Sequence, residues 1–491
     1  MAIGTISFEQ RPIEGAAKVP AITNWTPVVP YSVKQTSITD LFYFKFILEV
    51  RIDDASGTLL GKIKQRPNGY ATGTTNVYAL YDVSDIINTQ LENTYESISW
   101  DSGSSSYDVT GVIHTVGKNE PTEPFSHNQN QVRQIYVKGY QSYSESAAEI
   151  PSENTGVNAD NTKYYIAASL PLETPRDSGT YLQGTAFQGF QLKGTSGRFL
   201  SDVQQSPGDV VSASVYRNYV QWDESTNTGD YHTIGFLNGL STFDSEARYI
   251  NIAYYTAAGD QIGSTQELSN KNDAGGATPG SGGEVNTSAE RLIYCGVGPG
   301  NLQAQSDDTN ARPSNFTDWS YYKIWAEDAT GTGTKKSADY YFIKQDANCK
   351  GYKVRRLGWI NSLGCWDYFN FKMKSSQSVD VKKESYGKIL GEFNSTKYSY
   401  NNYDSSKKIR KTTAILKETL NTDWITEEDA ELLEKCVMST DVQIIENADT
   451  TYTVPVLVTN KNIKRKTSVN DGIKIQYTIQ IEYANPLNTN S

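Results

Sequence analysis

The sequence predicts a mainly β protein, in which tandem antiparallel β-sandwich-like domains are followed by a C-terminal α+β domain. Two observations lead to this prediction. The 491 residues are rich in Tyr, Thr, Ser, Asn and Gly and include only 3 Met, a composition that favours strands and polar turns over helices. Several runs also alternate apolar and polar side chains, which is the pattern of a strand with one buried face.

The clearest alternation near the N-terminus covers residues 41–52. One parity of this run is entirely apolar: Phe42, Phe44, Phe46, Leu48, Val50 and Ile52. We expect a strand here, a turn at 53–57 and a partner strand over 59–64. Residues 78–91 predict another strand that leads into a short helix capped at Ser84. These elements form a predicted N-terminal β domain over residues 1–128.

The next region, residues 129–345, is predicted to be β-sandwich-like and to hold one or two units. A strand-turn-strand pattern at 52–61 has a similar counterpart at 255–263, and a third variant spans 322–343. Repetition of such a unit fits sandwich domains. Strands are expected at 131–140, 163–169, 232–237 and 249–255, with a polar loop over 144–161 and an exposed loop over 270–287.

The last region, residues 346–491, changes character and is predicted to be a C-terminal α+β docking domain. Thr426 is expected to cap a helix, because three carboxylates follow it in the first turn, where the helix dipole favours negative charge. Leu432, Leu433 and Cys436 give this helix its apolar stripe. Strands at 442–445, 452–458 and 473–483 complete an antiparallel set, and the last of them alternates without a break.

The segment 349–371 predicts an aromatic hairpin with its turn at 361–364. Gly364 supplies a position that can take positive φ without strain. Aromatic hairpins of this kind are typical packing devices, because aromatic side chains bury much apolar surface. Cys349 and Cys365 flank the hairpin and either face each other or are two small buried thiols. The four cysteines form no C-x-x-C pair, which favours synthesis in a reducing compartment.

The pattern R-L-x-W-x-N-x-L-G-x-W-D-x-F-x-F in this hairpin resembles virion structural proteins of tailed bacteriophages, among them tail, baseplate and ring components. Residues 24–29 with 44–46 and 66–68, and the stretches 422–425 and 483–486, extend the resemblance. It implies that the hairpin residues are structural or interface positions. From its place directly after the turn, Asp367 is expected to hydrogen-bond the backbone of the turn. The positions singled out are Arg356, Trp359, Asn361, Gly364, Trp366, Asp367, Phe369 and Phe371.

The resemblance implies a non-enzymatic structural subunit in the tail, baseplate or neck of a virion, made in the host cytoplasm. We expect a homo-oligomeric ring whose C-terminal domain anchors it, with other virion proteins or fibres as partners. The alternative is a host-surface glycan-binding adhesin, for which the Tyr, Trp, Asn and Gly content is suitable. A glycan-degrading enzyme is the least favoured class.

No arrangement of residues indicates catalysis, so we expect no catalytic residue, cofactor or metal ion. The three histidines, His114, His127 and His232, are dispersed in sequence, unlike those of a metal site or a triad. Residues 296–301 lack the spacing of a dinucleotide loop and are interpreted as a bend after a strand. Trp222 and the adjacent acidic residues at 223–224 are interpreted as a sheet edge with exposed aromatics rather than a sugar-cleaving site.

Charge is unevenly distributed along the chain. Residues 346–420 contain 15 Lys or Arg against 7 Asp or Glu, a local charge of +8, so the total of −11 leaves −19 for the rest. No nucleic-acid motif accompanies the basic residues, and we expect this surface to dock on an acidic neighbouring subunit instead. No secretory signal and no apolar run of ~20 residues is visible, so we expect no membrane insertion.

Overall fold

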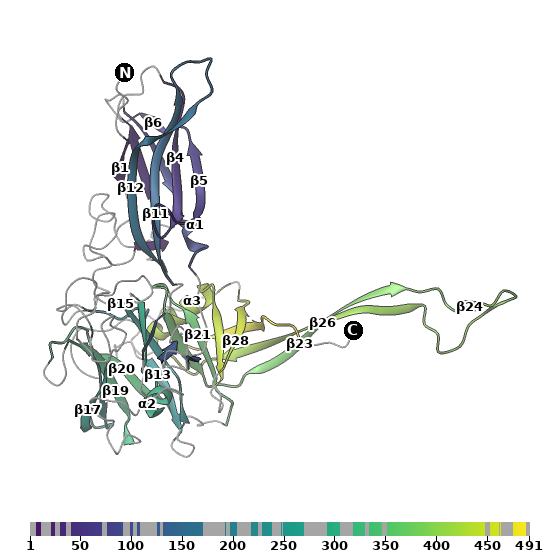
Figure 1. The fold of residues 1–491 in the computed structure, drawn as a ribbon. Helices are drawn as coiled ribbons and strands as arrows, with labels where there is room; N and C mark the ends of the chain where they lie inside the picture. Colours follow the sequence, from purple (N-terminus) through teal and green to yellow (C-terminus); the bar gives the residue numbers. More distant parts are fainter. Residues whose placement is uncertain are drawn as a thin grey trace. The chain divides into compact units, whose positions relative to one another are not determined.

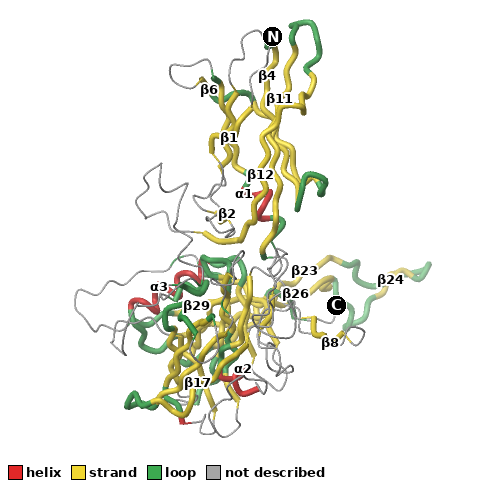
Figure 2. The backbone as a smooth tube through the Cα atoms, turned by 60° about the vertical axis from the view of Figure 1, so that its left-hand side comes forward, coloured by secondary structure: helices red, strands yellow, loops and turns green. Residues whose placement is uncertain are grey.

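The computed structural model is mainly β, which confirms the predicted fold class. Figure 2 shows strands throughout the described chain and few helical turns. Contacts divide the chain into two compact units: unit 1 comprises Met1–Asp346 with Ile360–Asp367, and unit 2 comprises Ala347–Trp359 with Tyr368–Ser491. The structure describes residues 6–10, 21–24, 30–35, 41–70, 76–91, 99–101, 106–108, 125–127, 131–169, 192, 197–203, 218–223, 228–237, 247, 249–269, 292–304, 318–328, 333–345, 351–446, 452–460, 462 and 475–487.

Unit 1 begins with a β-sandwich made of two sheets (Figure 1). The first sheet has the order β1 (Ile6–Gln10), β3 (Pro30–Gln35), β7 (Val77–Asp82) and β6 (Gly69–Tyr70), and all its neighbours are antiparallel. The second sheet has the order β2 (Ala21–Asn24), β12 (Ser152–Ser169), β11 (Val132–Ser144), β4 (Phe42–Ile52) and β5 (Leu59–Gln65). Because β4 pairs with β11 along its length, strands from both sides of residue 128 share this sheet.

The sandwich core is formed by alternate side chains of facing strands, as period two requires. Phe46, Leu48 and Val50 of β4 pack in one cluster with Tyr31 and Val33 of β3. The alternation predicted for β4 is therefore correct over most of its length.

The first position of the β4 alternation does not follow the prediction. Phe42 was expected in the buried face but is 42% exposed. Tyr43 next to it has φ +57, which rotates the strand, and the pairing with β11 shifts register between Ser142 and Ser144. A local bend of this kind ends the alternation.

Two other local predictions in this sandwich need correction. The expected loop at 144–161 is wrong over its second half, because β12 already begins at Ser152 and pairs with β11 there. The helix α1 (Ser84–Asn88) is present, but Val83 is its N-cap residue and no side chain caps it. Instead, the Asp82 carboxylate accepts a hydrogen bond from the Ser84 backbone N–H at 3.0 Å.

Three further sheets and a second core are formed by the described residues in the rest of unit 1. A six-stranded sheet has the order β14 (Thr228–Gly229), β13 (Asn218–Asp223), β20 (Tyr340–Gln345), β19 (Tyr321–Glu327), β16 (Tyr249–Tyr255) and β17 (Gln261–Ser269). A three-stranded sheet joins β10 (Phe125–His127), β18 (Leu292–Gly296) and β15 (Thr233–Leu237), and β8 (Ser99–Asp101) pairs with β9 (Ser106–Asp108). The predicted hairpins at 255–263 and 322–343 are β16–β17 and β19–β20; the predicted loop over 270–287 lies outside the described residues.

Trp222 and His232, two of the residues considered for catalysis, are buried in this part of unit 1, whereas His114 lies outside the described residues. Trp222 is 3% exposed, so the interpretation as an exposed aromatic is wrong for this residue; its strand, β13, lies between β14 and β20. His232 is buried with its ring edge-on to Phe342. The bend at 296–301 continues into a short helix, α2 (Pro299–Ala304), which the sequence pattern did not predict.

The described residues of unit 2 form a seven-stranded sheet and one helix. The sheet order is β22 (Trp366–Phe371), β21 (Arg355–Ile360), β27 (Val442–Glu446), β28 (Tyr452–Val458), β29 (Thr478–Tyr483), β26 (Lys407–Asn421) and β23 (Ser376–Gly387). Helix α3 (Glu427–Met438) begins at Thr426 as predicted, with a capping box between Thr426 and Asp429. Leu432, Leu433 and Cys436 are buried, which confirms the predicted apolar stripe.

Candidate assembly interface

The eight hairpin positions lie on β21, β22 and the turn between them, and all of them are buried. Arg356 donates a hydrogen bond to the Asn370 side chain at 2.9 Å and lies 4.9 Å from the centre of the Tyr368 ring. Trp359, Trp366, Phe369 and Phe371 are between 0% and 5% exposed. These side chains form packing contacts within the chain, as the prediction of a packing device states.

The turn of this hairpin is organised by Asn361. Its side-chain oxygen accepts hydrogen bonds from the backbone N–H groups of Leu363 and Cys365, both at 3.0 Å, and its amide donates to the Leu200 carbonyl at 3.0 Å. Gly364 has φ +80, and a Cβ there would lie 2.4 Å from the carbonyl oxygen of Ala167. The predicted need for glycine is therefore confirmed, and close approach of a neighbouring strand adds to it.

Asp367 has different partners from those expected. It accepts hydrogen bonds from the Ser201 hydroxyl at 2.6 Å and from the Asp202 backbone N–H at 2.8 Å. The Asp202 carboxylate in turn accepts from the backbone N–H of Ser362 at 2.8 Å and from its hydroxyl. The carboxylates of Asp367 and Asp202 thus connect the hairpin and its turn to residues 201–202. Burial, together with the charge of Asp202, raises the pKa of Asp367 to about 7.

The cysteines near the hairpin do not form a cross-link in the described residues. Cys365 is a free thiol and is buried, and burial raises its pKa. Cys349 lies outside the described residues. Cys295 and Cys436 are also buried, and neither forms a disulfide among the described residues.

A surface suited to another subunit is found elsewhere in unit 2, on β23 and β26. These two strands pair from Ser376 and Thr419 to Gly387 and Lys407. Figure 1 shows them as a long ribbon that runs away from the other strands of the sheet and ends in the small hairpin β24 (Glu392–Phe393) and β25 (Tyr398–Ser399). We call residues 376–417 the arm.

Among the described residues, no second layer of structure covers most of the arm. Every residue of β23 is exposed, and so are the first five residues of β26. A two-stranded ribbon alone in water is marginally stable, because it has no hydrophobic face to bury. The arm nevertheless presents large apolar side chains to solvent: Val379, Val381, Tyr386, Ile389, Phe393, Tyr398, Tyr400, Tyr403 and Ile409.

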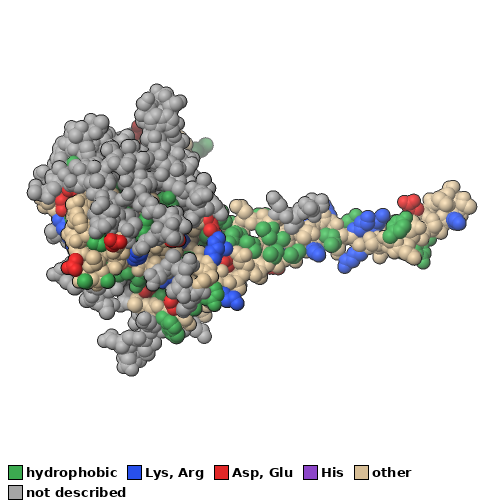
Figure 3. Space-filling model, turned by 90° about the horizontal axis from the view of Figure 1, so that it is seen from below, with side chains coloured by type: hydrophobic (Ala, Val, Ile, Leu, Met, Phe, Trp, Pro, Cys, Tyr) green, Lys and Arg blue, Asp and Glu red, His purple; other side chains and the backbone are tan. Residues whose placement is uncertain are grey.

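Basic side chains lie among these apolar ones, as Figure 3 shows along the arm. The arm contains nine Lys or Arg and four Asp or Glu, a net charge of +5, and the total of −11 therefore leaves −16 for the rest of the chain. Exposed apolar surface bordered by charge is typical of a protein–protein contact. The arm is therefore the best candidate for an assembly interface among the described residues.

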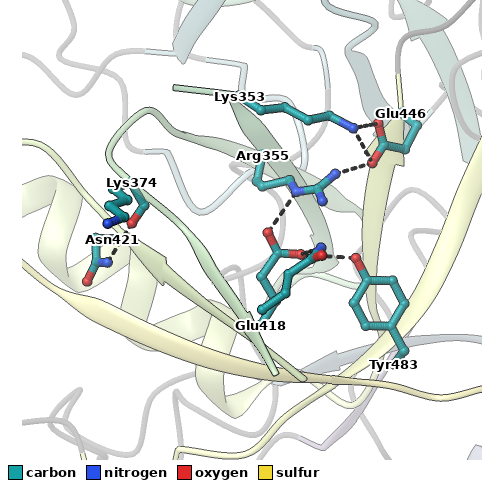
Figure 4. Close-up of polar contacts among 8 residues, drawn as sticks. Lys353, Arg355, Lys374, Glu418, Asn421, Glu446 and Tyr483 are labelled. Carbon is teal, nitrogen blue, oxygen red and sulfur yellow. Dashed lines mark hydrogen bonds and ion pairs between the residues drawn. The ribbon is translucent and has the colours of Figure 1, made fainter. Parts of the chain in front are cut away.

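The root of the arm is held to the unit 2 sheet by Glu418 of β26 (Figure 4). Its side chain is fully buried and accepts hydrogen bonds from Arg355 Nε at 2.9 Å, Gln377 Nε2 at 3.0 Å and the Tyr483 hydroxyl at 3.0 Å. Arg355 also pairs with Glu446 of β27. Glu418 therefore connects β26 to β21, β23 and β29 at the point where the arm leaves the sheet.

The electrostatics of this root cluster favour the charged form of Glu418. Burial by itself raises the pKa of this carboxyl, but hydrogen bonds from Gln377 and Arg355 outweigh burial and hold the pKa below its usual value of 4.5. Tyr483 responds in the opposite direction, because burial and the neighbouring Glu418 charge raise its pKa to about 12. The cluster is thus a fixed ion pair with a neutral phenol.

The arm is the element that sequence reasoning did not find. The basic residues 382–383 and 407–411 were expected to form a docking surface, but their place on a free ribbon was not predicted. A sequence signal for an exposed ribbon is present at 376–387, where both faces of a strand-like run are polar apart from three apolar residues. A strand inside a sheet needs one apolar face, and this run has none.

Other kinds of site are not indicated in the described part of the chain. Among the described residues, no group of three or more His, Cys, Asp or Glu is placed to hold a metal ion, and no helix is long and apolar enough to cross a membrane. No known family model and no curated protein matches the chain.

Proposed function

We propose that the protein is a structural subunit of a tailed-phage virion, in the tail, baseplate or neck, and that the arm joins it to neighbouring subunits. The resemblance of the hairpin at 356–371 to virion proteins supports the setting. The exposed arm supports the mechanism, and it is the observation that carries the proposal.

The mechanism follows from what the arm lacks. A ribbon with solvent-exposed apolar side chains gains stability when another surface covers them, since burial of apolar area is favourable at roughly 25 cal/mol per Å². Glu418 and Arg355 fix the strands at the root, so the arm leaves unit 2 in a defined direction. An arm that reaches a different patch on the next copy makes a heterologous contact, which closes into a ring when it is repeated by rotation.

Removal of apolar side chains from the arm tests this mechanism. The variant Ile389→Ser, Phe393→Ser, Tyr403→Ser keeps the length of the ribbon, and these side chains are 83%, 71% and 84% exposed. We expect sedimentation velocity to show loss of the oligomer, and we expect the variant to be incorporated less into particles. Thermal unfolding of the chain should change little.

A matched control replaces three exposed apolar residues outside the arm: Leu59→Ser, Leu80→Ser and Leu457→Ser, which are 45%, 52% and 57% exposed. This control is expected to assemble like the unmodified chain. Equal assembly by the arm variant and the control would contradict the proposed role of the arm.

Immunogold electron microscopy tests the setting independently. Antibody against residues 1–128 is expected to label the tail or neck of purified particles. Particles without label would remove the support for a virion subunit, whatever the oligomeric state of the purified chain.

The second candidate function is a host-surface glycan-binding adhesin. The observation that favours it is a hollow on the N-terminal sandwich, lined by an exposed tyrosine and by cationic side chains. The two functions are compatible, because a virion subunit can also contact a host surface.

A further inference from the structure

A hollow of about 780 Å³ lies at one end of the N-terminal sandwich. It is bounded by the first residues of β4, the last residues of β5 and the loop at 145–151 between β11 and β12. Figure 1 draws this loop in blue at the top. Its volume falls in the range of ~300–1,000 Å³ that is usual for small-ligand sites.

The walls of the hollow are fixed by hydrogen bonds within the chain. The Tyr43 hydroxyl donates to the Ala147 carbonyl at 3.0 Å, across the opening between β4 and the loop. Inside the loop, the Ser144 hydroxyl donates to the Ser146 carbonyl at 2.5 Å, and the Glu149 N–H donates to the same carbonyl at 3.2 Å. A site formed before binding loses less entropy when a ligand enters.

Two cations of the hollow have no acidic partner among the described residues. Lys64 is engaged, since its Nζ lies 2.7 Å from Glu153. Lys45 and Arg66 line the same hollow and form no ion pair within the described part of the chain. An arginine fork fits a carboxylate with two parallel hydrogen bonds. The hollow therefore has spare positive charge of the kind that binds a carboxylate.

The remaining lining groups favour a sugar ring. Tyr43 lines the hollow and is 58% exposed, so its aromatic ring is accessible to a ligand. Ser142 and Glu149 offer a hydroxyl and a carboxylate for hydrogen bonds to sugar hydroxyls. Nucleic acid is less suitable, because binding of a phosphate backbone requires a track of cations. Here Glu149 and the paired Lys64 interrupt the positive charge.

We propose that this hollow binds a carboxylate-bearing sugar residue of an acidic polysaccharide. Lys45 and Arg66 hold the carboxylate, Tyr43 contacts the face of the ring, and Ser142 and Glu149 hydrogen-bond its hydroxyls. The inference rests on the second candidate function and specifies its ligand class. It does not depend on assembly through the arm.

The test is isothermal titration calorimetry of the full chain at low salt with tetragalacturonic acid. The matched neutral probe is the same tetramer with its carboxyls methyl-esterified. We expect the acid to bind and the ester to bind at least ~10-fold more weakly, because the charge-assisted contacts are lost. Lys45→Gln, Arg66→Gln and Tyr43→Ala are each expected to weaken binding of the acid about 5-fold or more.

The control variant is Lys34→Gln, which removes a lysine of the other sheet whose Nζ lies 3.5 Å from Glu9; it should bind the acid like the unmodified chain. Equal affinity for acid and ester, no binding at millimolar acid, unchanged binding by the three hollow variants, or tighter binding of an eight-residue thymidine oligonucleotide would each overturn the proposal. Sedimentation of the same samples separates this result from failure of the arm to assemble.

Discussion

At the scale of single residues, Glu418 shows how a buried charge can fix an extended element. Its carboxylate is fully buried, and Arg355, Gln377 and Tyr483 all donate to it. Removing one partner of a buried ion pair is costly, because the other charge keeps its desolvation penalty. We expect Glu418→Gln to lower the free energy of unfolding by about 3 kcal/mol, measured by urea denaturation. Arg355 retains Glu446, so the loss should lie at the lower end of the usual range.

The control for this prediction is Asp380→Asn. Asp380 pairs with Lys417 at 3.0 Å, but both side chains are substantially exposed, and exposed pairs contribute under about 1 kcal/mol. Glu418 also makes the stability of the fold depend on pH. Its pKa is lowered in the folded chain, so its stabilisation is present above pH 4.5 and is lost as the pH falls through the folded pKa. A Glu418→Gln chain that lost as little stability as Asp380→Asn would contradict this role.

Asp367 changes the stability of the fold with pH in the direction opposite to Glu418, because burial and the charge of Asp202 raise its pKa to about 7. Between its ordinary pKa of 3.8 and pH 7 the folded chain binds more protons at this site than the unfolded chain. The stability of the fold therefore falls as the pH rises through that window. We expect Asp367→Asn, which resembles the protonated acid, to flatten the decrease in melting temperature between pH 4 and pH 8. An unchanged pH profile would show that another group is responsible.

At the scale of elements, the turn at 361–365 depends on one glycine for two separate reasons. Gly364 has φ +80 and no room for a Cβ beside Ala167, whereas Gly351 has φ +71 and a Cβ added there would meet no atom within 4 Å. The backbone penalty is shared by both, at about 1–2 kcal/mol. We expect Gly364→Ala to cost clearly more than Gly351→Ala in chemical denaturation. Equal costs would mean that the hairpin can move away from the Ala167 carbonyl.

Local patterns predicted the elements well where the side chains themselves decide the structure. The β4 alternation, the Thr426 cap and the stripe of α3 are all properties of neighbouring residues, and the structure confirms them. The partners of Asp367 were not predictable in this way, since Ser201 and Asp202 lie 166 and 165 residues away in the chain. Contacts of that range are set by packing of whole sheets, which a single sequence does not specify.

The arm shows, for an entire element, the same limit of prediction from a single sequence. Residues 376–387 are strand-like in pattern whether they lie inside a sheet or extend from it, because the pairing of β23 with β26 is identical in both cases. Only the absence of an apolar face distinguishes the two. The polar composition of both faces therefore signals that residues 376–387 are exposed, whereas the pairing of β23 with β26, which makes these residues an arm, depends on a contact between separated segments of the chain.

At the scale of the whole molecule, charge is divided between the arm and the rest of the chain. The arm has a net charge of +5 and the remainder −16. When a basic arm meets an acidic surface of a second copy, complementary potentials accelerate and strengthen the encounter, and dissolved salt screens them. We expect self-association, measured by sedimentation equilibrium, to weaken between 50 mM and 500 mM NaCl.

The arm should account for much of that salt dependence. Lys407 and Lys408 lie in its fully exposed part, so Lys407→Gln with Lys408→Gln should weaken association at low salt and reduce the slope of affinity against salt concentration. Lys34→Gln with Lys45→Gln removes the same charge from the sandwich and should leave that slope nearly unchanged. If instead both pairs reduced the slope equally, net charge alone would control association, and the arm would have to dock through its apolar side chains without electrostatic guidance.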